Sequence, residues 1–392
     1  MDKRVFKLSE VIVIIVITAL LSAVVTGFIS YNTLIKTKKV TYVNLTNDKD
    51  LKEFLEVYAE LVTDYYKDIN KKELLDSAIN GMTTYLDENY TTHLSKTDTS
   101  NLLNSLSGQY QGIGIEIKED LVINDVFESS PAKKAGLKKG DKLIKVDDEV
   151  LEGKTASEAA SLIKDSKKKS VVVTVLRDNE EMEFTIELSS VNIPSVYGEV
   201  VTDTKIGYIY LNTFSNTTYT QFKDKLEDLE KKNITSLIID VRGNGGGYLI
   251  SAKQIASLFI EQGKLIYSLE DKNTKVDYKD ETKEKRSYPV VILIDENSAS
   301  ASEILTAALV DSYGAKTVGT TSYGKGKVQQ TKELKDGSLV KFTSAKWLRP
   351  NGTCIDEVGI TPDIKVELEV KDGKIIDSQY NKAVDYLKNN SK

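Results

Sequence analysis

The chain has 392 residues, enough for two or three domains, and its 40% hydrophobic and 29% charged residues are typical of a globular protein with a sizeable core. Its net charge of −6 argues against a dedicated nucleic-acid binder. One histidine, His93, and one cysteine, Cys354, exclude an intrachain disulfide and a metal site built from several Cys and His ligands. A hydrolytic serine must therefore use His93 or another type of base, for which lysine is the obvious candidate.

Residues 1–31 are predicted to form a short cytoplasmic terminus and an uncleaved transmembrane anchor. Three basic residues precede the segment 8–31, which carries no charge between Val11 and Ile29. An apolar run of this length can cross a bilayer as a helix. A cleaved signal peptide is the main alternative, but the run is long for that purpose and no small-x-small cleavage site follows it. The sequence therefore predicts a single-pass protein of the cell membrane whose remaining domains are extracytoplasmic.

Residues 32–107 are predicted to form a polar linker followed by a helical segment. Over residues 51–62, apolar side chains recur at three- and four-residue spacing, which is typical of an amphipathic helix. A second helix is expected from Leu74, with Gly81 ending it. His93 follows in a polar stretch predicted as a loop, where a lone histidine is usually solvated.

Residues 108–190 contain short strand-like runs with tight turns and helical stretches between them. Residues 112–115, Gly-Ile-Gly-Ile, carry glycines that let the backbone expose successive N–H groups, and such groups bind a carboxylate. An extended peptide can add along the adjoining strand edge. Together with SPAKKAGLKKGD at residues 130–141, this arrangement resembles a PDZ domain, and a small β domain with tight turns is the alternative. The loop that would bind a peptide's C-terminal carboxylate consists of Gly112, Ile113, Gly114 and Ile115.

Residues 191–365 alternate between continuous apolar strands and helical stretches. This order predicts an α/β core with parallel strand pairing. The strand at residues 290–296 leads into SASAS at residues 298–302 and then into a helix. Such a turn places a hydroxyl at the end of the sheet, beside the free N–H groups of a first helical turn. A serine-rich helix cap is the alternative interpretation, and Ser302 is expected to take that role.

Three segments in this order resemble the C-terminal processing (tail-specific) peptidases, a family of serine proteases that use a lysine as base. They are DVRGNGGG at residues 240–247, SASASE at residues 298–303 and GKGKVQQ at residues 324–330. The resemblance covers residues 50–365. It implies a crotonase/Clp-like α/β protease core at residues 191–365, behind the PDZ domain.

The resemblance implies that Ser300 is the nucleophile and that Lys325, 25 residues later, is its base. A serine hydroxyl is a poor nucleophile unless a base accepts its proton. Because burial disfavours the ammonium form, we expect Lys325 to be desolvated and neutral in the active enzyme. Gln329 is implied to hold the lysine amine in line. The backbone N–H groups predicted to bind the developing oxyanion are those of Gly246 and Ala301, with Gly247 as a substitute.

The sequence as a whole predicts a multi-domain α/β protein with a transmembrane helix, a helical segment, an α+β PDZ domain and a Ser-Lys protease core. The predicted function is a membrane-anchored endopeptidase that captures apolar C-termini of protein or peptide substrates and needs no cofactor or metal. A catalytically silent PDZ scaffold is one alternative, and a serine esterase is another, although no G-x-S-x-G elbow surrounds Ser300. The resemblance also implies a homodimer formed through terminal helices. Residues 366–392 contain an amphipathic helix whose docking the sequence does not indicate.

Overall fold

The fold is known from a computed structural model. It describes residues 48–164, 166, 168–371 and 374–390. The transmembrane anchor predicted in residues 1–31 lies outside these residues. Within the described part of the chain, every helix is too short or too polar to cross a membrane.

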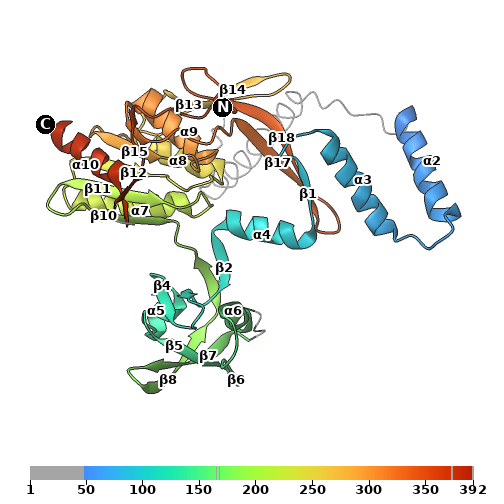
Figure 1. The fold of residues 1–392 in the computed structure, drawn as a ribbon, viewed down its shortest axis with the longest axis horizontal. Coiled ribbons are helices and arrows are strands. Elements are labelled where there is room, and N and C mark those ends of the chain that lie inside the picture. The colour runs from blue at the N-terminus through green and yellow to red at the C-terminus, as the bar shows by residue number, and fades with distance from the viewer. Residues whose placement is uncertain (1–47, 165, 167, 372–373, 391–392) are drawn as a thin grey trace, which may run out of the picture. The chain divides into compact units, whose positions relative to one another are not determined.

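The described chain begins with two helices, α2 (Lys49–Asp64) and α3 (Lys71–Tyr85) (Figure 1). The chain divides into two compact units, Met1–Ala78 and Ile79–Lys392, and the boundary between them falls within α3. The Asp48 carboxylate caps α2 by accepting a hydrogen bond from the N–H of Leu51 at 3.1 Å. The prediction that Gly81 ends the second helix is wrong, because the chain continues helically beyond it. A helical glycine costs only about 1 kcal/mol, which the flanking residues outweigh.

His93 lies in a strand and not in the predicted loop. Strand β1 (Thr92–Leu94) pairs antiparallel with β18 (Leu339–Leu348), where His93 is opposite Val340. The Nδ1 atom of its ring is 3.3 Å from Oδ1 of Asn80. The strand forms because a partner far along the chain supplies its hydrogen bonds, which no local pattern indicates.

The region predicted as a PDZ domain folds as small β-sheets with two helices, and α4 (Lys96–Ser107) leads into it. Its elements are β2 (Gln109–Gly112), β3 (Ile115–Ile117), β4 (Ile123–Val126), α5 (Pro131–Ala135), β5 (Lys142–Val146), β6 (Glu149–Val150), α6 (Ala156–Lys164), β7 (Ser170–Arg177), β8 (Glu180–Glu187) and β9 (Ser189–Asn192). Strand β2 pairs antiparallel with β9, so the chain enters and leaves the domain side by side. Its apolar core includes Ile113, Leu143 and Val173.

The predicted α/β core is built around a six-stranded sheet in the order β10-β11-β12-β15-β16-β19. Its elements are β10 (Val196–Val200), β11 (Ile206–Leu211), α7 (Thr218–Lys231), β12 (Ser236–Asp240), α8 (Leu249–Ser257), β15 (Val290–Ile294), α9 (Ala301–Ala308), the π-helical turn η1 (Leu309–Tyr313), β16 (Lys316–Gly319) and β19 (Ile364–Lys365). All neighbouring pairs are parallel except β10 and β11. The central strands β12 and β15 are buried along their whole length, which explains their continuous apolar sequences.

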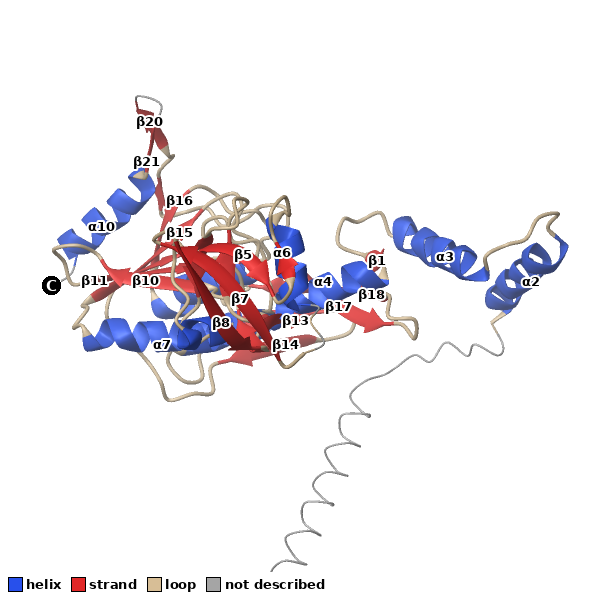
Figure 2. Ribbon diagram, turned by 90° about the horizontal axis from the view of Figure 1, so that it is seen from below, coloured by secondary structure: helices blue, strands red, loops and turns tan. Residues whose placement is uncertain are grey.

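The sheet separates two apolar clusters because successive side chains of a strand point to opposite faces. Leu237 and Ile239 of β12 pack in the cluster that contains α7, α8 and α9. Ile238 packs in the other cluster, against Leu387 of the C-terminal helix α10 (Ser378–Asn390). Figure 2 shows α7 and α10 on opposite sides of β10 and β11. The C-terminal helix therefore completes the second layer of the core.

A second, antiparallel sheet carries the segment that follows Lys325. Its order is β1-β18-β13-β14, and β17 also pairs with β18. Its remaining strands are β13 (Leu265–Glu270), β14 (Lys275–Lys279) and β17 (Lys327–Glu333). A separate hairpin, β20 (Glu369–Lys371) and β21 (Lys374–Ile376), precedes α10. Ser300 thus follows a strand of the parallel sheet, and Lys325 precedes a strand of the antiparallel sheet.

Candidate active site

Ser300 lies at the sharp turn between β15 and α9. Its backbone angles, φ 55° and ψ −112°, are rare for a residue other than glycine, and such a conformation costs about 1–3 kcal/mol. The carbonyl oxygen of Asn244 holds the turn from both sides: it accepts from the N–H of Ala299 at 3.0 Å and from the hydroxyl of Ser302 at 2.8 Å. Ser302 is therefore buried and hydrogen-bonded to the loop at residues 243–247, which we call the glycine loop. The predicted helix-cap role of Ser302 is wrong, because Ser300 occupies the cap position.

Lys325 is half-buried, and its Nζ atom lies 4.7 Å from the centre of the Tyr90 ring. Its pKa is lowered from the ordinary lysine value, first by burial and then by the positive charge of Lys341, while Glu303 opposes the shift. Within the described chain, no hydrogen bond joins the Lys325 amine to the Ser300 hydroxyl. A cation over an aromatic ring is stabilised by the ring electrons, so Tyr90 favours the charged form of the lysine.

Gln329 lies on β17, and its side-chain amide donates a hydrogen bond to the carbonyl oxygen of Lys327 at 3.2 Å. Among the described residues it makes no hydrogen bond to Lys325. The orienting contact predicted for Gln329 is therefore not formed in this conformation.

The glycine loop follows β12 and lies against the serine turn. Gly246 has φ 98°, and a side-chain Cβ atom there would be 2.9 Å from both the backbone nitrogen of Ala301 and Cβ of Ser300. Only glycine allows this approach. The N–H of Gly246 donates to Oδ1 of Asn244 at 2.9 Å, so it is not available to an oxyanion here. In the described residues, the N–H of Gly247 is not hydrogen-bonded, and that of Ala301 starts a helix and has no intrahelical acceptor.

These segments enclose one cavity of about 530 Å³. Ser300, Lys325 and Gln329 line it, as do Gly246 and Gly247. Its remaining wall includes two more lysines and one face of α4: Lys327, Lys341, Leu102, Ser105 and Leu106. The structure therefore brings the predicted nucleophile, base and glycine loop to one cavity.

Comparison with known proteins gives two matching family models. Peptidase family S41 matches residues 205–366, and the PDZ domain matches residues 100–188. The chain is 36% identical over 360 residues to the carboxy-terminal processing protease CtpA of Bacillus subtilis (strain 168), a match that covers 91% of this chain and 76% of the relative. This chain belongs to peptidase family S41. It is thus a serine-type peptidase with a PDZ domain.

Other relatives agree with this assignment. A probable CtpA-like serine protease of Staphylococcus aureus (strain MRSA252) is 35% identical, with 90% of this chain and 71% of the relative covered. A solved structure titled photosystem II D1 C-terminal processing protease is similar at a TM-score of 0.50 and 24% identity, covering 82% of this chain and 88% of that one. This likeness supports the fold alone. The predicted family, the PDZ domain and the mixed α/β fold are confirmed.

Sequence reasoning missed Glu303 in this S41 peptidase and read it only as the start of a helix. Its carboxylate is fully buried between the turn that carries Ser300 and the loop at residues 322–325, which we call the lysine loop. It accepts hydrogen bonds from the Ser300 N–H (2.8 Å), the Ser322 hydroxyl (2.6 Å), the Gly324 N–H (2.7 Å) and the Lys325 N–H (2.9 Å). Burial raises the pKa of Glu303, and these hydrogen bonds oppose the rise. Glu303 therefore connects the backbones of Ser300 and Lys325.

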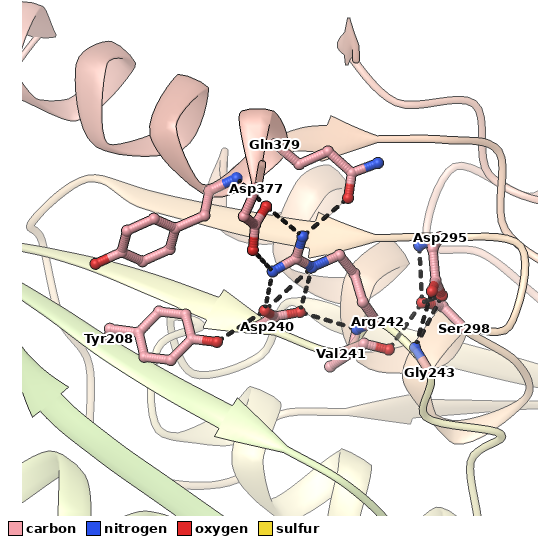
Figure 3. A network of polar contacts seen from close by, with 10 residues as sticks. Tyr208, Asp240, Val241, Arg242, Gly243, Asp295, Ser298, Asp377 and Gln379 are labelled. Carbon is pink, nitrogen blue, oxygen red and sulfur yellow. Dashed lines mark hydrogen bonds and ion pairs between the residues drawn. The ribbon is translucent and has the colours of Figure 1, made fainter. Parts of the chain in front are cut away.

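Sequence reasoning also missed a polar network that joins the glycine loop to the C-terminal segment (Figure 3). The Arg242 guanidinium contacts Oδ2 of Asp240 at 2.6 Å and forms two hydrogen bonds with the Asp377 carboxylate, at 2.7 and 2.8 Å. It also donates to Oε1 of Gln379 at 2.9 Å. Burial lowers the pKa of Arg242, but the hydrogen bonds to the two carboxylates outweigh it and the pKa is raised. Arg242 thus links the segment after β12 to the start of α10.

The same network continues to the serine turn through Asp295. The Asp295 carboxylate accepts from the N–H of Gly243 at 2.9 Å and from the Ser298 hydroxyl at 3.0 Å (Figure 3). The Ser298 hydroxyl also lies 2.8 Å from the carbonyl oxygen of Val241. Both segments beside Ser300 are therefore held by polar contacts, of which the one between Ser298 and Val241 is buried and hence costly to break.

The predicted carboxylate loop lies between β2 and β3, in the PDZ domain. Ile113 points into the apolar core, and its carbonyl oxygen accepts from the N–H of Ala132 at 2.9 Å. Gly114 has φ 87°, and a side chain there would collide with Ser130. The loop is therefore held by its core side chain and by α5, and among the described residues the N–H of Gly114 has no backbone acceptor.

Proposed function

We propose that this chain is a membrane-anchored serine endopeptidase that recognises apolar polypeptide C-termini and cleaves through an acyl-enzyme. The observation that supports the chemistry best is the cavity that Ser300 and Lys325 share with the glycine loop. Ser300 is presented on a strained turn, and Lys325 has a lowered pKa. A hydroxyl beside an amine that is easily deprotonated is the arrangement that a Ser-Lys pair requires.

In the first step, neutral Lys325 accepts the proton of the Ser300 hydroxyl as the serine oxygen attacks the peptide carbonyl carbon. The lysine side chain must first turn from the Tyr90 ring toward Ser300. The resulting ammonium then gives its proton to the leaving amine, the C–N bond breaks, and the acyl-enzyme remains. A water molecule attacks the ester, Lys325 again carries the proton, and Ser300 is regenerated. Gln329 is proposed to orient the amine once it leaves the carbonyl of Lys327.

The oxyanion of both steps is proposed to bind backbone N–H groups beside Ser300. Ala301 and Gly247 supply N–H groups that have no acceptor among the described residues, and Gly246 contributes when its N–H leaves Asn244. Each such donor is typically worth about 3 kcal/mol in the transition state.

The PDZ loop is proposed to select the substrate. Backbone N–H groups at residues 112–115 are proposed to bind the terminal carboxylate, and the PDZ domain is proposed to take the apolar side chain of the last residue. Residues 8–31 are proposed to anchor the enzyme, with its catalytic domain outside the cytoplasm, which membrane fractionation and protease protection of intact cells would test. A homodimer through the terminal helices is the assembly we propose, and light scattering would measure it.

The decisive experiment is degradation of a folded-domain substrate with an unstructured apolar tail by the wild-type protein and by its Ser300→Ala and Lys325→Ala variants. Each variant is expected to lose at least about 10³-fold in kcat/KM, because nucleophile and base act as a unit. Melting temperatures and tail-peptide binding should stay near wild type. Full turnover by either variant would overturn the Ser-Lys mechanism. Equal inactivity of all three proteins would favour the silent scaffold, and hydrolysis of esters without peptides would favour an esterase.

A further inference from the structure

The backbone of Lys325 is held on both sides, so its side chain alone can turn toward Ser300. Its N–H donates to the Glu303 carboxylate at 2.9 Å, and its carbonyl oxygen accepts from Nε1 of Trp347 at 2.8 Å. The backbone N–H of Trp347, a fully buried residue, donates to the carbonyl oxygen of Gly326 at 2.9 Å. The position of the Lys325 amine therefore depends on what its side chain contacts.

Tyr90 reaches this amine from a short segment that binds β18. The backbone N–H of Thr343 donates to the Thr91 hydroxyl at 3.1 Å, and the Thr343 hydroxyl donates to Oε2 of Glu88 at 2.9 Å. The Thr91 hydroxyl donates to the other oxygen of the Glu88 carboxylate. Because Glu88 and Thr91 lie on either side of Tyr90, these contacts hold its backbone without using its ring.

The Tyr90 ring contacts two lysines. The Nζ atoms of Lys325 and Lys327 lie 4.7 and 5.7 Å from the ring centre. Lys327 is also 3.7 Å from the carboxylate of Asp356. Within the described residues, the amine of Lys325 forms neither a hydrogen bond nor an ion pair. The ring electrons stabilise a charged amine and have much less effect on a neutral one, so the ring is the direct contact that favours charged Lys325.

We infer that Tyr90 is a positioning residue, which holds the charged Lys325 side chain in a resting position and releases it when the amine loses its proton. This inference rests on the proposed Ser-Lys mechanism and adds the residue that decides when the base becomes available. Tyr90 takes no part in the chemistry. The neutral amine leaves the ring, turns to the Ser300 hydroxyl and accepts its proton, so the ring competes with Ser300 only while the lysine is charged.

The resting position predicts a pH effect that depends on the ring. Because the ring stabilises the charged amine, Lys325 should lose its proton at lower pH when the ring is removed. An apolar side chain of similar size keeps the amine shielded from water. Burial raises the pKa of Tyr90 to about 12, so Tyr90 itself stays protonated near neutral pH. The titratable groups around the amine and the ring, all kept in the variants, are Glu303, Tyr323, Lys327, Lys341 and Asp356.

The first measurement is the pKa of Lys325 itself, by NMR of carbon-labelled lysine in the full chain carrying Ser300→Ala. Lys325→Arg identifies the signal. We expect Tyr90→Leu to lower this pKa by about 0.5–1, the order of one cation–π contact. Tyr90→Phe keeps the ring and should keep the wild-type pKa. Tyr66→Leu is the matched control, because the Tyr66 ring lies 4.9 Å from Nζ of another lysine, Lys67, and its loss should leave the pKa of Lys325 unchanged.

The second measurement is the pH profile of kcat/KM with Ser300 intact. Tyr90→Leu should move the acid limb to lower pH and raise kcat/KM on that limb about three- to tenfold, with the plateau within about twofold of wild type. A tyrosine that only supports the fold would instead lower the plateau and the melting temperature and leave the limb in place. Tyr90→Met should repeat the result and guards against a folding defect particular to Tyr90→Leu.

An unchanged pKa of Lys325 in folded Tyr90→Leu and Tyr90→Met would overturn the inference. So would a Tyr90→Phe variant that behaves like Tyr90→Leu, because the hydroxyl and not the ring would then be the partner. If the pKa falls as expected but no variant and no wild-type protein cleaves peptides, the proposed function fails and the role of Tyr90 in it fails with it. The NMR and kinetic results together therefore separate failure of the inference from failure of the proposed function.

Discussion

The PDZ domain and the protease core build their candidate binding sites from different groups. The carboxylate loop at residues 112–115 offers backbone N–H groups and needs few side chains. The site around Ser300 is held by polar side chains, each at most 2% exposed. They include Asp240, Asn244, Ser298, Ser302 and Glu303. The PDZ site therefore depends on glycines and on the backbone conformation of the loop. The site around Ser300 depends on a hydrogen-bond network that one substitution can break.

This difference predicts how each region responds to change. Removing one partner of a buried hydrogen bond leaves the other unsatisfied, so core substitutions should lower both stability and kcat. Changes at the PDZ loop alter an interaction with the tail alone, so they should act mainly on KM. The predictions below test this contrast, from the largest expected effect to the smallest.

The largest effect after loss of Ser300 or Lys325 is expected for Glu303→Gln. The amide replaces one acceptor oxygen with a donor that faces N–H groups of the serine turn and lysine loop. We expect kcat to fall about 10²-fold, the order expected when a catalytic group moves by 1 Å, and stability to fall by about 1–3 kcal/mol. Steady-state kinetics and urea unfolding measure the two effects.

The matched control is Glu261→Gln, an exposed glutamate whose nearest basic partner, Lys264, is 3.7 Å away. It should change neither quantity. Near-wild-type kcat in Glu303→Gln would mean that the buried carboxylate does not position Ser300 and Lys325.

The PDZ loop gives the next effect, through the substrate and not the enzyme. Amidating the substrate C-terminus removes the charge that the N–H groups bind, and we expect KM to rise about tenfold, since a hydrogen bond to a charged group is worth about 1.5–3 kcal/mol. The value of kcat should stay nearly constant. A large fall in kcat would show that the tail also controls the chemical step, and unchanged kinetics would remove the loop from substrate recognition.

A smaller effect is expected for Asp377→Asn, which weakens the link between α10 and the glycine loop. The side chain of Asp377 is 43% exposed, so solvent screens its ion pair with Arg242, and we expect a loss of about 1 kcal/mol and a few-fold lower kcat. Burial raises the pKa of Asp377, but the hydrogen bonds and charge of Arg242, with the N–H of Tyr380, outweigh it and the pKa is lowered. The pair therefore stabilises the fold above the unfolded-state pKa of Asp377, and this contribution disappears as pH falls through the lowered folded-state pKa.

Thermal unfolding from neutral to acidic pH should show the two proteins converging at low pH. Asp228→Asn is the control, since its pair with Lys231 joins side chains that are 60% and 74% exposed. Equal stability of Asp377→Asn and the wild type at neutral pH would contradict the role given to this link.

The sequence predicted the features that short stretches of residues determine. The apolar strand before Ser300, the glycine run after Asp240 and the strand-helix order of the core each depend on neighbouring residues, so their patterns sufficed. The contacts of Glu303 with Ser322 and of Arg242 with Asp377 join distant segments, and only the packed fold brings them together. Strand β1 at His93 and the helix that continues past Gly81 likewise depend on context that outweighs local preference.

The sequence also did not predict the side-chain conformations of the site. The motif assigns Lys325 and Gln329 to one site but does not place the lysine over Tyr90 or the glutamine on the carbonyl of Lys327. The free-energy differences between such rotamers are small compared with those that determine the fold, so one sequence pattern is compatible with several rotamers.

The smallest effect is expected for Lys341→Ala, which should shift the pH profile of kcat/KM without lowering its maximum. Lys325 must be neutral to act, so kcat/KM should rise with pH through its lowered pKa. Burial lowers that pKa most, the positive charge of Lys341 lowers it further, and Glu303 raises it. Removing the Lys341 charge should therefore raise the pKa of Lys325 and move the acid limb of the profile to higher pH, with the plateau nearly unchanged. Lys341→Arg keeps the charge and should keep the wild-type limb. A limb that moves to lower pH, or that moves equally in both variants, would show that Lys325 is not the titrating base.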